Sequence, residues 1–123
     1  MKKPLCTIAL LSVTALSGCS LSPGELRAKY SPDVVHTSAK HSKEIAMCVA
    51  DKWENSNVIG ASVRVSFRPT SFGYTVSKYL GDELHYLIDI TDTSTGTQTK
   101  AWRYKVMSLG RDSNMSAISD CQL

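Results

Sequence analysis

Cysteine is the most reactive residue type in this chain of 123 residues, which contains Cys6, Cys19, Cys48 and Cys121. A thiol can form a disulfide, hold a metal ion or carry a covalent modification, and its surroundings decide which of these applies. Cys19 ends the stretch Leu16-Ser17-Gly18-Cys19, directly after an apolar run. The small residues before it would let a peptidase hold the backbone extended and close to its own, as a processing site requires.

The segment before Cys19 has the organisation of an export signal. Lys2 and Lys3 form a positive start, and residues 5–16 form an apolar stretch of signal-peptide length. This stretch is shorter than the roughly 20 apolar residues that a membrane-spanning helix needs. Together with Leu16-Ser17-Gly18-Cys19, it resembles the lipobox of bacterial lipoprotein precursors over about the first twenty residues.

The lipobox resemblance implies a removed signal peptide, residues 1–18, with cleavage between Gly18 and Cys19. It also implies a diacylglyceryl group on the Cys19 sulfur and a further acyl chain, such as palmitate, on the freed amine. One acyl chain binds a membrane only marginally, whereas two or three anchor a protein stably. In the enterobacterial sorting rule that accompanies the lipobox, Ser20 favours the outer membrane. The alternative is an ordinary secretory signal, which prefers an Ala-x-Ala-like site.

Signal removal would leave Cys48 and Cys121 as a pair in an oxidising envelope, because Cys6 departs with the signal. We expect a disulfide between them that closes most of the folded domain into one loop. Two free buried thiols or a metal site are the alternatives. No histidine lies at metal-ligand spacing from either cysteine, which favours the disulfide.

The mature chain has the length of one small domain. Residues 19–41 contain two prolines and little periodicity, so we expect a flexible, mostly extended tether that holds the domain off the bilayer. We expect an α+β domain over residues 42–123, beginning with an amphipathic helix capped by Ser42. A short helix is expected from about Asp112 to Cys121. The predicted buried stripe of the first helix comprises Ile45, Ala46, Cys48, Val49 and Trp53.

The hydrophobic period changes to two after residue 60, which is typical of β-strands. About four strands are predicted, in an antiparallel meander over residues 63–68, 74–78, 84–91 and 97–106. We expect the two helices, joined by the disulfide, to cover one face of this sheet. In the third strand, Leu84, Tyr86, Ile88 and Ile90 are predicted to share one face. In the fourth strand, Trp102, Tyr104 and Val106 are predicted to share one face.

The opposite sheet face is then free to bind a partner. Its candidate contact residues are Arg64, Arg68, His85, Leu87, Asp89, Arg103 and Lys105. An ordinary solvated face is the simpler alternative for the same residues. His85 and Asp89, four positions apart on one strand, are also the nearest approach to an acid–base pair. Solvated neighbours are the favoured interpretation of that pair.

Neither an enzyme nor a cofactor or metal site is predicted. No serine lies in a Gly-x-Ser-x-Gly elbow, and no His-x-x-x-His or EF-hand spacing occurs. The net charge of +3 falls to +1 once the signal is removed, which argues against a nucleic-acid partner.

The pattern of residues 46–54, followed by Gly73-Tyr74-Thr75-Val76 and a late cysteine, is similar to small uncharacterised proteobacterial lipoproteins. The hypothesis is therefore a non-enzymatic, lipid-anchored protein of the cell envelope, expected in the outer membrane, whose domain contacts another envelope protein. Two more specific forms are an inhibitor or immunity protein against an envelope-targeted hydrolase, and an accessory protein of a secretion or envelope complex.

Overall fold

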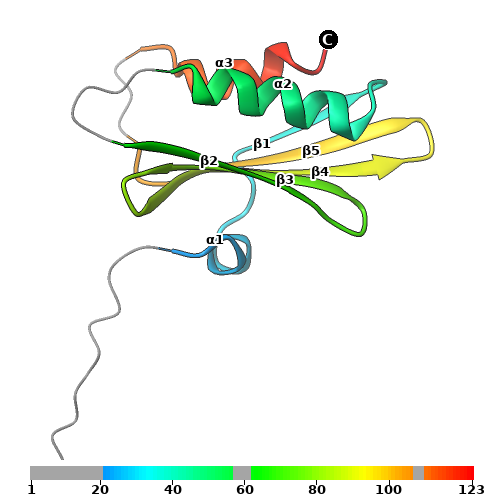
Figure 1. The fold of residues 1–123 in the computed structure, drawn as a ribbon. Coiled ribbons are helices and arrows are strands. Elements are labelled where there is room, and N and C mark those ends of the chain that lie inside the picture. Colours follow the sequence, from blue (N-terminus) through cyan, green and yellow to red (C-terminus); the bar gives the residue numbers. More distant parts are fainter. Residues whose placement is uncertain (1–20, 57–61, 107–109) are drawn as a thin grey trace, which may run out of the picture.

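An antiparallel sheet with helices on both faces organises the protein (Figure 1). The computed structural model describes residues 21–56, 62–106 and 110–123. In chain order, the elements of these residues are α1 (Pro23–Lys29), β1 (Val34–Ser38), α2 (Ser42–Glu54), β2 (Val63–Pro69), β3 (Gly73–Leu80), β4 (Glu83–Thr93), β5 (Gly96–Arg103) and α3 (Ser113–Asp120). The predicted α+β class is confirmed, and so is the meander from β2 to β5.

The sheet has five strands, in the order β1-β5-β4-β3-β2. The additional strand is β1, which pairs with β5 from Val34 opposite Ala101 to Ser38 opposite Thr97. It lies inside residues 19–41, so the predicted tether is wrong for the described part of that segment. β-branched side chains favour a strand here. Five residues between two irregular stretches are too few to reveal their alternation.

A second part of the expected tether forms α1. The Ser22 side chain accepts a hydrogen bond from the Glu25 amide, and Pro23 occupies the first turn, where its fixed φ suits a helix. Leu26 is only 1% exposed. Figure 1 shows α1 on the face of the sheet opposite to α2 and α3. The expectation that helices cover one face only is therefore wrong.

The face under α2 and α3 holds the larger core. As predicted, Ile45, Val49 and Trp53 of α2 are buried, while Met47 on the other side of the helix is 49% exposed. The helix begins one residue earlier than expected, because His41 occupies the cap position and Ser42, the expected cap, is already helical and buried. The sheet residues of this core include Val76, Tyr86, Ile88, Ile90 and Ala101.

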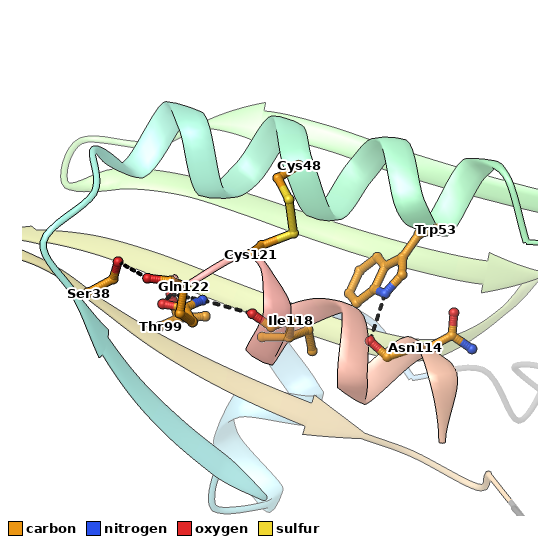
Figure 2. Close-up of a disulfide and its surroundings, with 8 residues drawn as sticks. All are labelled: Ser38, Cys48, Trp53, Thr99, Asn114, Ile118, Cys121 and Gln122. Carbon is orange, nitrogen blue, oxygen red and sulfur yellow. Dashed lines mark hydrogen bonds between the residues drawn. A yellow bond between two sulfur atoms is a disulfide. The ribbon is translucent and has the colours of Figure 1, made fainter. Parts of the chain in front are cut away.

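A disulfide joins the two helices on this face, as predicted. Cys48 of α2 and Cys121, directly after α3, are bonded with their α carbons 5.9 Å apart. Figure 2 shows this bridge beside the Trp53 indole, which donates from Nε1 to the Asn114 carbonyl at 3.1 Å. The Ser38 hydroxyl donates to the Gln122 carbonyl at 2.6 Å, which connects the end of β1 to the segment after α3.

A β-bulge changes which residues of β4 share a face. Tyr79 pairs with Leu84 and Lys78 pairs with Tyr86, so His85 is the extra residue. Because side chains alternate along a strand, the extra residue moves Leu84 to the face on which α1 packs, the α1 side, whereas Tyr86 stays under α2 and α3. The predicted shared face of Leu84 with Tyr86, Ile88 and Ile90 is therefore wrong at Leu84.

The faces of β5 are opposite to the expected ones. Thr99 and Ala101 are fully buried on the α2 and α3 side, and Trp102 packs with Leu26 on the α1 side. Both faces of this strand are covered, so a hydrophobic residue does not reveal which face it occupies. The strand also ends at Arg103, earlier than the expected Val106.

Replacing both bridged cysteines with alanine should lower the free energy of unfolding by about 4 kcal/mol, because the bridge closes a loop between residues 73 positions apart. Urea unfolding of the mature protein measures this loss. A reductant should destabilise the wild type by a similar amount and leave the double variant unchanged. A double variant within about 1 kcal/mol of the wild type would contradict the expectation.

Candidate functional site

The sheet face that was predicted to contact a partner is covered in part, because α1 packs on it (Figure 1). This face, the α1 side, carries Leu84, Leu87 and Trp102, which form one cluster with Leu26. Leu87 is 0% exposed, so the prediction that it is available to a partner is wrong. Gly18 and Cys19, the predicted cleavage and lipidation residues, lie outside the described residues.

Asp89 lies on the α1 side and holds α1 in place. Its two carboxylate oxygens accept from Nε and Nη2 of Arg27 at 2.6 and 2.8 Å, and the Thr75 hydroxyl donates to it at 2.7 Å. The hydrogen bond to Asp89 raises the pKa of Arg27. Two parallel bonds of this kind fix orientation as well as distance. Asp89 therefore serves the packing of α1.

His85 does not join Asp89 in an acid–base pair. Its Nδ1 lies 2.9 Å from the Tyr104 carbonyl oxygen, and its Nε2 lies 3.4 Å from a Glu83 carboxylate oxygen. His85 thus contacts residues around the bulge, whereas Asp89 contacts Arg27 of α1. The sequence reasoning assumed unbroken alternation from residue 85 to residue 89, and the bulge removes that premise.

The remaining candidate residues lie in three different places. Arg64 and Arg68 are exposed on β2, and the Arg64 guanidinium stacks over the Tyr79 ring at 4.1 Å. Arg103 donates to Asp112 at 3.1 Å, which places it at the start of α3. Lys105, two residues after the end of β5, has a left-handed backbone conformation with φ of 50°. The seven predicted residues do not form one continuous surface.

Sequence reasoning missed a polar cluster beneath the start of α3. The Lys78 ammonium is buried and donates to Ser56 Oγ and to Asn114 Oδ1. Burial lowers the pKa of Lys78, and the charge of Asp112 partly opposes this. The available signal was the position of Lys78, in phase with Tyr74 and Val76 on the buried face of its strand.

Asp112 connects this cluster to the sheet and to α3. It caps α3 by accepting from the Asn114 and Met115 amides, and it also accepts from the Tyr86 hydroxyl. Burial raises its pKa, but the hydrogen bonds from Arg103, Met115 and Tyr86 outweigh burial, so the net pKa is lowered. Burial also raises the pKa of Tyr86 to about 12.

Lys78 and Ser56 together are a residue combination that can support nucleophilic catalysis. Here the Ser56 hydroxyl donates to the Trp53 carbonyl at 2.8 Å, at the end of α2. The hydroxyl proton of Ser56 and two of the three ammonium protons of Lys78 therefore already bind structural acceptors. The arrangement fastens the end of α2 and the start of α3 to the sheet.

Two hollows flank the Arg27–Asp89 pair on the α1 side. The larger, about 500 Å³, is lined by residues that include Arg27, Lys29 and Lys100. The smaller, about 260 Å³, includes Arg27, Arg68 and Phe72. Cationic side chains around a hollow suit an anionic group. Among the described residues, no three histidine, cysteine or acidic side chains are grouped to hold a metal ion.

No protein-family model matches this chain, and comparison with curated proteins and with solved structures found no similar protein. None of the helices in residues 21–56, 62–106 and 110–123 is long and apolar enough to span a membrane.

The Asp112→Asn variant should be less stable than the wild type by about 1–2 kcal/mol at pH 7, because hydrogen bonds to a charged group are lost. Folding lowers the pKa of Asp112. The contribution of its carboxylate to the free energy of unfolding is therefore complete above the pKa in the unfolded chain, about 3.9, and disappears as the pH falls through the pKa in the folded protein. The difference between the two proteins should therefore shrink below pH 4.

Thermal unfolding between pH 7 and pH 2 measures this difference. Asp120→Asn, in the exposed last turn of α3, is the matched control, since it removes the same charge outside the cluster. An Asp112→Asn curve parallel to the wild-type curve down to pH 2 would exclude this role for Asp112.

Proposed function

We propose that this protein is a lipid-anchored lipoprotein of the cell envelope that binds another protein and has no catalytic activity of its own. The observation that carries the proposal is Leu16-Ser17-Gly18-Cys19 after a positive and apolar segment. The Cys48–Cys121 bridge supports it, because disulfides persist in oxidising compartments and are rare in the cytosol. Ser20 favours the outer membrane as the destination.

The contacts of the reactive side chains favour a binding role. Nucleophilic or acid–base catalysis needs a group whose proton is free to move toward a substrate. Asp89 is occupied by Arg27 and Thr75. Lys78 is buried with polar partners of its own. Each of these groups already stabilises the contact between a helix and the sheet.

Strand β2 is the most suitable part of the described fold for contact with a partner protein. It lies at the edge of the sheet, so on its outer side none of the described strands pairs with its backbone groups. Phe67 is 40% exposed there and contacts Tyr74 with ring centroids 5.1 Å apart. An edge with an apolar side chain suits the addition of an extended segment from a partner.

Intact mass measurement of the protein purified from bacterial membranes tests the anchor. The expected product starts at Cys19 and carries two or three acyl chains. Cys19→Ser should block processing and accumulate the precursor, because the acceptor sulfur is lost. Cys6→Ser, in the same segment, is the matched control and should be processed normally. An unmodified N-terminus on the wild-type protein would contradict the proposal.

Photocrosslinking in living cells tests the proposed partner contact. A crosslinker at residue 67 should capture a specific protein, whereas a crosslinker at residue 47, exposed on α2, should not. A foreign hydrolase as the captured protein identifies an inhibitor or immunity protein, and a resident envelope complex identifies an accessory subunit. Equal, unspecific capture from both positions would exclude β2 as the contact.

A further inference from the structure

The proposed anchor lies very close to the folded domain. Only Ser20 separates Cys19 from Leu21, and Leu21 packs against the cluster of Leu26, Leu84, Leu87 and Trp102 on the α1 side. An extended chain advances at most about 3.6 Å per residue, so the α carbon of Cys19 lies within about 7 Å of that of Leu21. Acyl chains on Cys19 would therefore hold the α1 side next to the bilayer.

The α1 side carries positive charge around its two hollows. Lys29 and Lys100 line the larger hollow, and Arg68 lines the smaller one. In the part of the chain that the structure describes, no salt bridge joins any of these three side chains to a carboxylate. Asp89, the acid between the hollows, is paired with Arg27. The three cations are therefore available to an anionic surface.

Two aromatic side chains lie beside these cations. Phe72, in the turn between β2 and β3, lines the smaller hollow and is 73% exposed. Tyr30, directly after α1, lines the larger hollow and is 48% exposed. Aromatic rings next to lysine and arginine are the side chains that the headgroup region of a bilayer accommodates well. Each hollow is therefore lined by an exposed aromatic ring as well as by cationic side chains.

We infer that the α1 side rests on the phosphate-bearing headgroups of the bilayer that holds the acyl chains. Lys29, Arg68 and Lys100 lie against the phosphates, and Phe72 enters the boundary with the acyl chains. The inference rests on the proposed lipidation of Cys19. An acidic protein has a similar charge, but the short link to the anchor leaves little space for one between the α1 side and the bilayer.

Quenching of tryptophan fluorescence by brominated lipids tests this contact. The full mature lipoprotein carrying Phe72→Trp is reconstituted in vesicles with about one-third phosphatidylglycerol, and the wild-type signal of Trp53 and Trp102 is subtracted. The residue 72 signal should be strongly quenched. Met47→Trp, on α2, should not be quenched because it faces away from the bilayer. Tyr30→Trp provides a second reporter on the α1 side.

Charge removal and high salt test the docking of the domain separately from the anchoring of the protein by its acyl chains. Neutralising Lys29, Arg68 and Lys100 with glutamine should lower the ratio of docked to undocked domain by roughly fivefold for each cation. Neutralising Lys43, Lys52 and Arg111 removes the same charge elsewhere and should have little effect. Salt at 1 M should release the domain, since it screens these charges. The protein itself should still float with the vesicles.

The outcomes distinguish this inference from the lipid anchor. An acylated protein that floats with vesicles while residues 72 and 47 are equally unquenched overturns the docking and leaves the anchor intact. A protein without acyl chains that does not bind the vesicles overturns both. A photocrosslinker at residue 72 that captures an acidic protein in cells, without lipid quenching, assigns the α1 side to that protein and overturns the inference.

Discussion

Burial of Leu26 against the second face of the sheet is the contact on which the arrangement of this protein depends. A helix of seven residues is not stable alone, so α1 exists because the sheet holds it. Burying a leucine side chain contributes roughly 2 kcal/mol to the free energy of unfolding. The bidentate contact between Arg27 and Asp89 fixes the orientation of the helix. The sheet is thereby buried on both faces, as the neighbouring residues Leu87 and Ile88 of β4 show.

The opposite face is held by a different combination of forces. The disulfide joins α2 to the segment after α3, and the buried Lys78 joins α3 to the sheet through Asn114. A buried ammonium group is costly unless it is hydrogen-bonded, so this contact specifies where α3 must lie. The proposed membrane contact uses side chains of the α1 side, which include Arg68 of β2, whereas the proposed partner contact uses the outer backbone edge of β2 and Phe67.

The parts of the fold with long, regular patterns could be predicted from the sequence. The stripe through Ile45, Val49 and Trp53 predicts α2, and alternation predicts the strands of the meander. The cysteine pair was predicted from the expected compartment and not from geometry. Patterns of this kind are reliable because one buried face repeats over several turns or residues.

The elements that sequence reasoning missed have physical reasons to be inconspicuous. α1 buries only one residue, Leu26, and β1 has five residues, so neither repeats its period often enough. The bulge at His85 has no local signature, yet it reverses the face of Leu84. The prediction of one continuous partner face was wrong for the same two reasons, because it assumed that no helix covers that face and that the strands have no bulge.

The pairing of β1 with β5 also constrains the order in which the domain can form. β1 is made early, but its neighbour among the described strands is β5, which is the last strand of the meander to be made. Contacts between distant segments form slowly, because a long loop must close first. A chain delivered from its N-terminus would therefore expose the edge of β1 until β5 emerged, and only the finished sheet could capture it.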